Sequence, residues 1–223
     1  MQRVQSLGLS RPPGIQRVVV SAYRVPTDAP ESDGTFEWSA TTLVLVEVAA
    51  GDVTGFGYTY ADVATARLVE EHLADVVTGH DATAVAGAHA AMCHAIRNVG
   101  RPGVASMGIA AVDTALWDLK ARLLGLPLLT LLGAVRESVP AYGSGGFTSY
   151  SVERLQEQLG GWVADGIARV KMKVGRHPAR DVDRVRAARS AIGAAAELFV
   201  DANGAYSRKQ ALDFADAFAE LGV

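Results

Sequence analysis

The sequence predicts an α+β domain followed by alternating parallel β-strands and α-helices. Residues 15–60 are rich in strand-forming side chains, and a long alanine-rich stretch with helical periodicity follows over 62–132. Strand-like and helix-like segments then alternate over 138–223, at the spacing typical of right-handed βαβ units. An antiparallel sheet with packed helices, followed by a parallel sheet, accounts for this order.

Length and composition restrict the class of protein. The chain has 223 residues, with 49% hydrophobic and 20% charged side chains, which allows a globular core and argues against disorder. The net charge of -3, without a dense Lys/Arg run, argues against nucleic-acid binding. Cys93 is the single cysteine, so no internal disulfide can form. Because neither a secretory signal nor a membrane span is evident, we expect a cytoplasmic protein with no membrane partner.

The N-terminal part predicts a small antiparallel sheet. Residues 1–14 end in Arg-Pro-Pro-Gly and are predicted to form a loose segment. Strands are expected over 15–25, 38–49 and 55–60, the last two joined by a Gly-Asp turn. Residues 26–35 contain two prolines and three acids and are therefore predicted to be an exposed loop.

Three helices are predicted next, near residues 63–78, 82–99 and 106–124, with glycines and prolines between them. The third helix has a buried face, because apolar side chains recur at three- and four-residue spacing. These side chains are Ile109, Val112, Leu116, Leu119 and Leu123.

The C-terminal part predicts three strand–helix pairs. The strands are expected at 138–142, 169–174 and 198–201, and the helices at 151–165, 178–192 and 207–218. Ser151 is predicted as an N-cap, and Ser207 with Gln210 three residues later forms the pattern of a capping box.

The strand at 169–174 carries two lysines two residues apart. Side chains at i and i+2 share a face of a strand, so Lys171 and Lys173 are expected side by side, with Met172 facing the other way. Burying two ammonium groups on an interior strand costs free energy, which indicates a functional role for them. A lysine with a lowered pKa can act as a base near neutral pH. The alternative is an edge strand with both lysines in water.

Polar groups follow all three predicted strands. Tyr142 and Ser144 follow the first, and Asp201 and Asn203 end the third. In a parallel sheet, ligands gather at the carboxyl ends of the strands, where these side chains would meet the lysines. A carboxylate there suits Mg²⁺, which would bind a carboxylate substrate and stabilise the enolate that deprotonation forms.

Several motifs together resemble the enolase superfamily, in particular its mandelate racemase and muconate-lactonising branches. They are Val-Lys-Met-Lys-Val at 170–174, Val-Asp-Ala-Asn-Gly-Ala-Tyr-Ser at 200–207, the helix at 107–120, Gly-Leu-Pro at 125–127 and Leu-Leu-Gly at 131–133.

The resemblance covers about residues 15–223 and implies a domain organisation. Residues 15–135 would form the α+β capping domain, and residues 136–223 the first three βα units of a TIM-type (β/α)₈ barrel. Such a barrel needs eight units, so the resemblance implies a truncated barrel, three of eight. We therefore expect this sequence to be the N-terminal part of a longer enzyme and to be inactive alone.

The resemblance also implies roles for single residues. Lys173 would remove the proton α to a carboxylate, and Lys171 would hold that carboxylate and lower the pKa of Lys173. Asp201 would be the first of three acidic Mg²⁺ ligands. Asn203 would contact the substrate or support the metal site. Tyr142 is also expected to contact the substrate, from its place at the end of the first predicted strand.

The function implied is Mg²⁺-dependent abstraction of an α-proton through an enolate, by a racemase or dehydratase of a hydroxy or sugar acid. A cycloisomerase or dipeptide epimerase of the same superfamily and a non-catalytic fragment are the alternatives. The loop at 26–35 and the hairpin near 55–60 would close over the barrel mouth and help to select the substrate. The expected partners are a small-molecule carboxylate substrate and further copies of the chain in a homo-oligomer.

Overall fold

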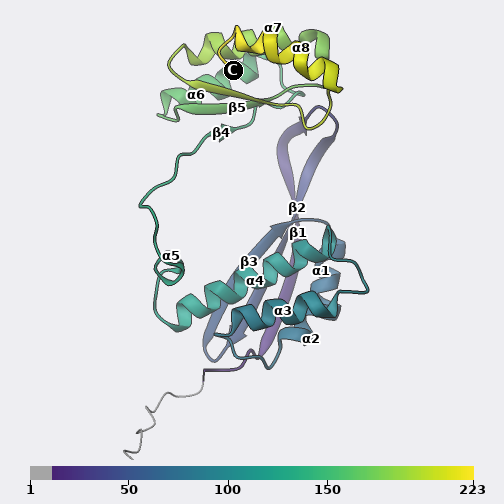
Figure 1. Ribbon diagram of the computed structural model, residues 1–223, viewed down its shortest axis with the longest axis vertical. Coiled ribbons are helices and arrows are strands. Elements are labelled where there is room, and N and C mark those ends of the chain that lie inside the picture. The colour runs from purple at the N-terminus through teal and green to yellow at the C-terminus, as the bar shows by residue number, and fades with distance from the viewer. Residues whose placement is uncertain (1–11) are drawn as a thin grey trace, which may run out of the picture. The chain divides into compact units, whose positions relative to one another are not determined.

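The computed structural model describes residues 12–223, which divide into two compact units (Figure 1). The first unit contains the described residues up to 25 together with 41–135, and the second contains 26–40 together with 136–223. Most of the segment predicted to be loose, residues 1–14, lies outside the described residues. Within the described part of the chain, no helix is both long enough and apolar enough to cross a membrane.

A three-stranded sheet runs through the first unit. Its order is β1 (Arg17–Ser32), β2 (Glu37–Ala50) and β3 (Val53–Tyr60), and β2 pairs with β3 in antiparallel register. In β2 every second residue from Val44 to Ala50 is fully buried, as expected for a strand with one face on a core.

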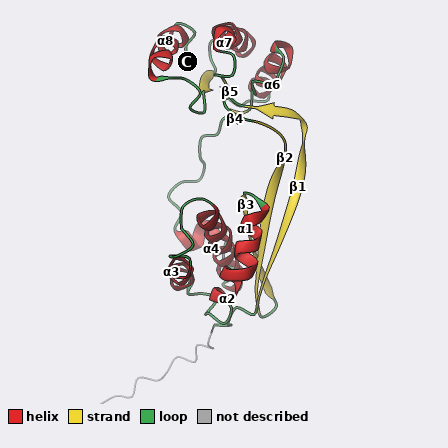
Figure 2. Cartoon of the chain, turned by 90° about the vertical axis from the view of Figure 1, so that its right-hand side faces the viewer, coloured by secondary structure: helices red, strands yellow, loops and turns green. Residues whose placement is uncertain are grey.

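Helices cover one face of this sheet (Figure 2). They are α1 (Val63–Leu68), the π-helical turn η1 (Val69–Leu73), α2 (Ala74–Val77), α3 (Val85–Ala95) and α4 (Val104–Leu123), and the short helix α5 (Leu128–Leu132) follows α4 in the chain. The three long helices that the sequence predicts are confirmed, although α3 is shorter than expected. Asp62 begins α1, where its side chain accepts the Ala64 N–H.

Helix α4 packs directly on β3. A Cβ atom on Gly57 would overlap the backbone of Ala111 and Ala115, so only glycine permits this approach. The Asp118 carboxylate also fastens the two elements, because it accepts the Phe56 N–H at 2.8 Å and pairs with Arg122 at 2.7 Å.

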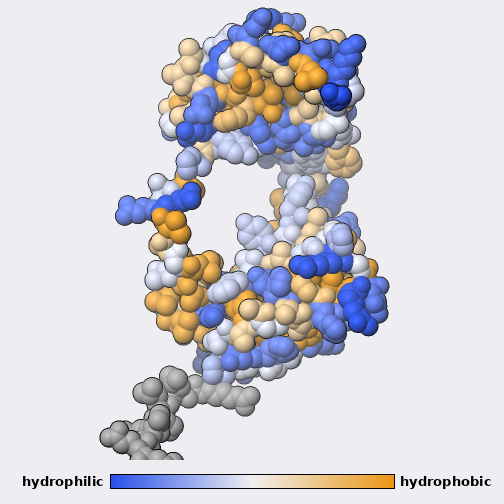
Figure 3. Space-filling model, viewed as in Figure 1, coloured by the Kyte–Doolittle hydropathy of each residue, from blue (hydrophilic) through white to orange (hydrophobic). Residues whose placement is uncertain are grey.

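The short helix α5 is not predicted by the sequence. None of its residues is buried, and Leu129 and Leu132 are more than half exposed. Figure 3 shows this leucine-rich segment as hydrophobic surface.

The second unit contains a parallel sheet in the order β4 (Gly143–Ser144), β5 (Arg169–Lys173), β6 (Glu197–Asp201). Helices follow the three strands: α6 (Val152–Ala164), α7 (Pro178–Ile192) and α8 (Arg208–Ala219). Their buried apolar side chains share one core with β5, which includes Leu155, Leu159, Met172, Val185 and Phe218. The N-cap at Ser151 and the capping box of Ser207 and Gln210 are both present, as predicted. The two units are consistent with a capping domain and part of a β/α barrel.

Two predicted segments differ from the structure. The strand predicted at 138–142 is wrong: residues 138–142 form no strand, and β4 begins only at Gly143, where the chain pairs with β5. Pro140 lies in the unpaired part and cannot donate to a ladder. The loop predicted at 26–35 is wrong over residues 26–32, which belong to β1. Because β1 is an edge strand, its prolines are tolerated there.

Candidate active site

Strand β5 presents its two lysines to one face. The side chains of Lys171 and Lys173 are 18% and 12% exposed, whereas Val170, Met172 and Val174 are fully buried on the other side. The strand lies between β4 and β6, so the alternative of an edge strand with solvated lysines is wrong.

The Asp201 carboxylate joins both lysines. Register places Asp201 opposite Lys173, and its Oδ2 atom accepts from Lys173 Nζ at 2.7 Å and from Lys171 Nζ at 3.2 Å. Its Oδ1 atom accepts the Asn203 N–H at 3.0 Å. Burial tends to raise the pKa of Asp201, but these hydrogen bonds and the positive charge of Lys173 outweigh burial and lower the pKa to about 2. The carboxylate is therefore ionised over the whole physiological pH range.

Asn203 completes what we call the lysine cluster, which consists of Lys171, Lys173, Asp201 and Asn203. Its Oδ1 atom accepts from Lys173 Nζ at 2.8 Å. Its φ of 49° is the one left-handed backbone conformation at a non-glycine residue in the part of the chain that the structure describes. Asparagine tolerates this conformation better than most residues, and such conformations concentrate at functional sites.

Tyr142 lies beside the cluster and is half exposed. The Lys171 Nζ atom is 5.6 Å from the centre of the Tyr142 ring, and that ring is 6.1 Å from the ring of Phe199 on β6. Ser144, which the sequence also places at this level, is exposed at the end of β4. The structure thus brings Tyr142 to the lysines but shows no hydrogen bond between it and the cluster within the described residues.

The oxygen atoms of the cluster partly fit a hard divalent cation. Asp201 supplies a carboxylate and Asn203 an amide oxygen, both of which are ligands that Mg²⁺ accepts. Over residues 12–223, however, no three His, Cys, Asp or Glu side chains converge as a metal site would require. These residues can supply one part of a Mg²⁺ ligand set.

The turn between β1 and β2 packs on the strand ends of the second unit. A Cβ atom on Gly34 would come within 2.6 Å of the carbonyl oxygen of Ala202, so the turn approaches the β6–α8 loop closely. Thr148 Oγ1 donates to the Asp33 carbonyl at 2.8 Å. Burial tends to raise the pKa of Asp33, but hydrogen bonds from Thr35 and Phe36 and the charge of Lys173 lower it. Asp33 carries no signal in the local sequence, because its neighbours in space are distant in the chain.

A second buried carboxylate ties together the loops that follow β5 and β6. Asp181 on α7 is 1% exposed, and its Oδ2 atom accepts the Gly175 N–H at 2.9 Å and the Tyr206 O–H at 2.6 Å. Burial and the hydrogen bond to Asp181 raise the pKa of Tyr206. The pair of Asp181 and Tyr206 was not predicted from the sequence. An acidic residue in the first turn of a helix is ordinarily explained by its favourable interaction with the helix dipole.

Comparison with known proteins identifies the family. The family model for the mandelate racemase / muconate lactonizing enzyme N-terminal domain matches residues 17–133, and the enolase C-terminal domain-like model matches residues 154–223. The chain belongs to the mandelate racemase / muconate lactonizing enzyme branch of the enolase superfamily.

Two curated relatives act on sugar acids or their derivatives, by name. The 3,6-anhydro-alpha-L-galactonate cycloisomerase of Streptomyces coelicolor is 35% identical over 94% of this chain and 60% of the relative. The L-talarate/galactarate dehydratase of Salmonella typhimurium is 35% identical over 76% of this chain and 44% of the relative. The chain thus spans between two fifths and three fifths of the length of these relatives.

Two solved structures resemble the chain closely. A mandelate racemase/muconate lactonizing enzyme-like protein from Rubrobacter xylanophilus has a TM-score of 0.93 and 61% identity, covering 94% of this chain and 58% of that one. A racemase from Streptomyces coelicolor with bound magnesium has a TM-score of 0.89 and 35% identity, covering 94% of this chain and 60% of that one.

Proposed function

We propose that this chain belongs to an enzyme that removes the α-proton of a carboxylate substrate in a Mg²⁺-dependent reaction. The observation that carries the proposal is the lysine cluster, in which two largely buried amines meet one ionised carboxylate at the ends of adjacent parallel strands. Burying two lysines and an aspartate costs free energy. This cost favours a functional role for the three side chains over a purely structural one.

Each residue of the cluster has a distinct proposed role. Lys173, the less exposed lysine, accepts the α-proton on Nζ, and Lys171 binds the substrate carboxylate beside the Tyr142 ring. Asp201 and Asn203 supply oxygen ligands to Mg²⁺. When bound, the ion supplies positive charge that stabilises the enolate. A cation at Asp201 would compete with the two ion pairs, and its positive charge would favour loss of the Lys173 ammonium proton to water, which leaves the neutral amine that a base requires.

We propose a hydroxy or sugar acid as the substrate, with racemisation or dehydration as the outcome. The resemblance to a talarate/galactarate dehydratase supports this class of substrate. Cycloisomerisation is the second candidate, because one relative is an anhydrogalactonate cycloisomerase. Dipeptide epimerisation would use the same pair of lysines and needs no hydroxyl group on the substrate.

We further propose residues 15–135 as the capping domain and 136–223 as three of the eight units of a barrel. On this proposal the 223 residues alone are inactive, because the metal site has one carboxylate where the superfamily pattern implies three. A cytoplasmic homo-oligomer is proposed as the working form. In it, residues 26–35 and the hairpin near 55–60 would contribute to substrate selection; contacts of residues 26–35 with the second unit support the first of these roles.

A substrate screen in deuterated water tests the proposal. The chain, completed with the remaining barrel strands of a relative, is incubated with a panel of hydroxy and sugar acids, with Mg²⁺ or with EDTA. We expect deuterium at the α-carbon of at least one acid, only with Mg²⁺. The Asp201→Asn variant should need more Mg²⁺ for half-maximal exchange. A Mg²⁺ titration identical to that of the wild type would refute Asp201 as a ligand.

A further inference from the structure

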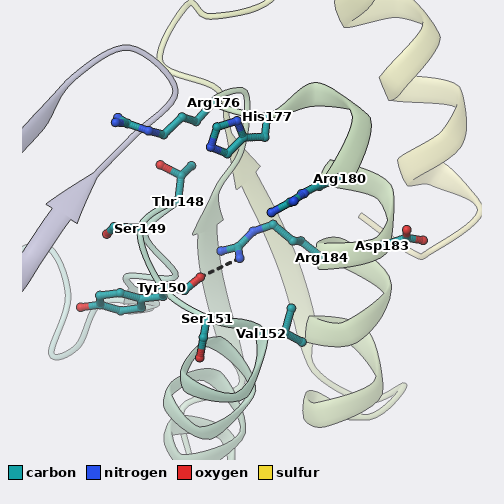
Figure 4. Close-up of a pocket in the computed structure, with 10 residues that line it drawn as sticks. All are labelled: Thr148, Ser149, Tyr150, Ser151, Val152, Arg176, His177, Arg180, Asp183 and Arg184. Atoms are coloured by element: carbon teal, nitrogen blue, oxygen red, sulfur yellow. Dashed lines mark hydrogen bonds between the residues drawn. The ribbon is translucent and has the colours of Figure 1, made fainter.

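A cavity of about 840 Å³ lies in the second unit, between the β4–α6 loop and helix α7 (Figure 4). Its wall includes Thr148, Ser149, Arg176, His177, Arg180 and Arg184, and we call it the basic cavity. None of these residues belongs to the lysine cluster. Its volume falls within the range of pockets that hold small molecules, about 300–1,000 Å³.

The charge of the basic cavity is predominantly positive. Three arginines line it, and Asp183 is the one acid among the lining residues that the structure describes. Asp183 pairs with Arg186, which is not part of the cavity wall, and its side chain points away from Arg180 and Arg184 (Figure 4). Nothing in the cavity wall therefore offsets Arg180, for which no ion pair is found among the described residues.

The arginines differ in how they are held. Arg176 forms an ion pair with Glu37 at 2.7 Å, which neutralises part of its charge. Arg184 donates to the carbonyls of Tyr150 at 2.8 Å and Phe147 at 3.0 Å, while its Nε atom is buried without a hydrogen-bond partner in the described structure. Burial lowers the pKa of Arg184, and the negative charge of the buried Asp181 carboxylate offsets part of this effect.

Arg180 and Arg184 extend from α7 toward the β4–α6 loop, whose carbonyls fix Arg184 in place (Figure 4). Arginine presents a planar array of donors that matches the oxygens of phosphate and carboxylate groups.

We infer that the basic cavity binds a small organic anion through a phosphate or carboxylate group, with Arg180 and Arg184 as its main contacts. Arg180 supplies a free charge at the opening, and Arg184 is a preorganised donor in the wall. The inference is independent of the chemistry proposed for the lysine cluster, since none of its contacts belongs to that cluster.

Calorimetric titration of the 223-residue chain at low salt tests this inference. Pyrophosphate probes a phosphate ligand and citrate a carboxylate ligand, and the tighter probe identifies the group that is recognised. We expect one saturable site, and Arg180→Gln should weaken it at least about tenfold, as the loss of a charge-assisted hydrogen bond does. Arg180 is exposed, so this variant should fold, which circular dichroism would verify.

Two controls make the result decisive. Arg208→Gln removes an exposed arginine from α8, outside the cavity wall, and should change the affinity less than twofold. The titrations are repeated on Lys173→Ala, because a carboxylate probe can also bind at the lysine cluster; the signal of the basic cavity is the part that persists in this variant and is lost in Arg180→Gln. The inference is overturned if neither probe binds saturably, if Arg180→Gln and Arg208→Gln weaken binding equally, or if Lys173→Ala abolishes all probe binding.

Discussion

The Asp201 carboxylate is the point at which the charges of the candidate active site meet. One of its oxygens accepts from two ammonium groups, and the other accepts a backbone N–H. Each of these donors favours the ionised form, which explains a pKa of about 2 in spite of partial burial. The same contacts make Asp201 a source of pH-dependent stability.

Lowering the pH should destabilise the second unit through Asp201. Its pKa is about 2 in the folded chain and 3.8 ordinarily, so ionisation favours the folded state. The stabilisation is complete above the ordinary pKa and is lost as pH falls toward 2, by at most about 2 kcal/mol. Urea unfolding between pH 5 and 2 should show a flatter pH profile for Asp201→Asn than for the wild type. Asp213→Asn, which changes an exposed carboxylate on α8, is the control, and a profile of Asp201→Asn as steep as this control would contradict the assignment.

Removing the Tyr206 hydroxyl tests the second carboxylate network. Tyr206→Phe leaves the buried Asp181 carboxylate with the Gly175 N–H but without its shortest hydrogen bond. We expect a loss of about 1–3 kcal/mol in the free energy of unfolding, because a buried charged acceptor is left undersatisfied. Tyr58→Phe, at an exposed tyrosine of the first unit, should cost much less in the same urea titration. Equal losses would mean that the Asp181 bond contributes nothing specific.

At the scale of elements, the turn between β1 and β2 is held by contacts with residues more than a hundred positions away. Thr148 donates to the Asp33 carbonyl, Ser149 to the Pro30 carbonyl, and Arg176 pairs with Glu37. Gly34 makes the close approach possible. Residues 26–40 therefore pack as part of the second unit, although they precede it in sequence by about a hundred residues.

A side chain at Gly34 should loosen this turn. A Cβ atom there would lie within 2.8 Å of Ala202 O, Ala205 Cβ and Val174 O, so Gly34→Val forces the turn away from the strand ends. We expect a loss of about 1–3 kcal/mol in stability and faster amide hydrogen exchange over residues 26–40. Gly161→Ala is a matched control, because no atom lies within 4 Å of the added methyl group and alanine favours a helix. Unchanged exchange in Gly34→Val would show that the turn is not held by this contact.

Local signals predicted the elements well, and distant contacts explain what they missed. The cap at Ser151, the capping box at Ser207 and the alternation around the lysines each depend on neighbours within four residues. The start of β4 depends instead on pairing with β5, and the prolines of β1 are tolerated because the strand lies at an edge. Asp33 and the Asp181–Tyr206 pair could not be found from the sequence, since their contacts join segments that no local pattern relates.

In the whole molecule, we propose Lys173 as the base that removes the α-proton. Matches over both parts of the chain establish the family, whereas the role of Lys173 is a proposal that rests on the family resemblance and on the contacts of the lysine cluster. A direct test must therefore follow the proton itself rather than substrate binding or stability.

The most direct measurement is α-proton exchange in deuterated water, followed by NMR on the best acid from the substrate screen. The chain, completed with the remaining barrel strands, is compared with Lys173→Ala and with the exposed-lysine control Lys209→Ala. We expect Lys173→Ala to lower the exchange rate by at least about a hundredfold, while the acid still binds and the control exchanges at the wild-type rate. Exchange at the wild-type rate in Lys173→Ala would rule out Lys173 as the base.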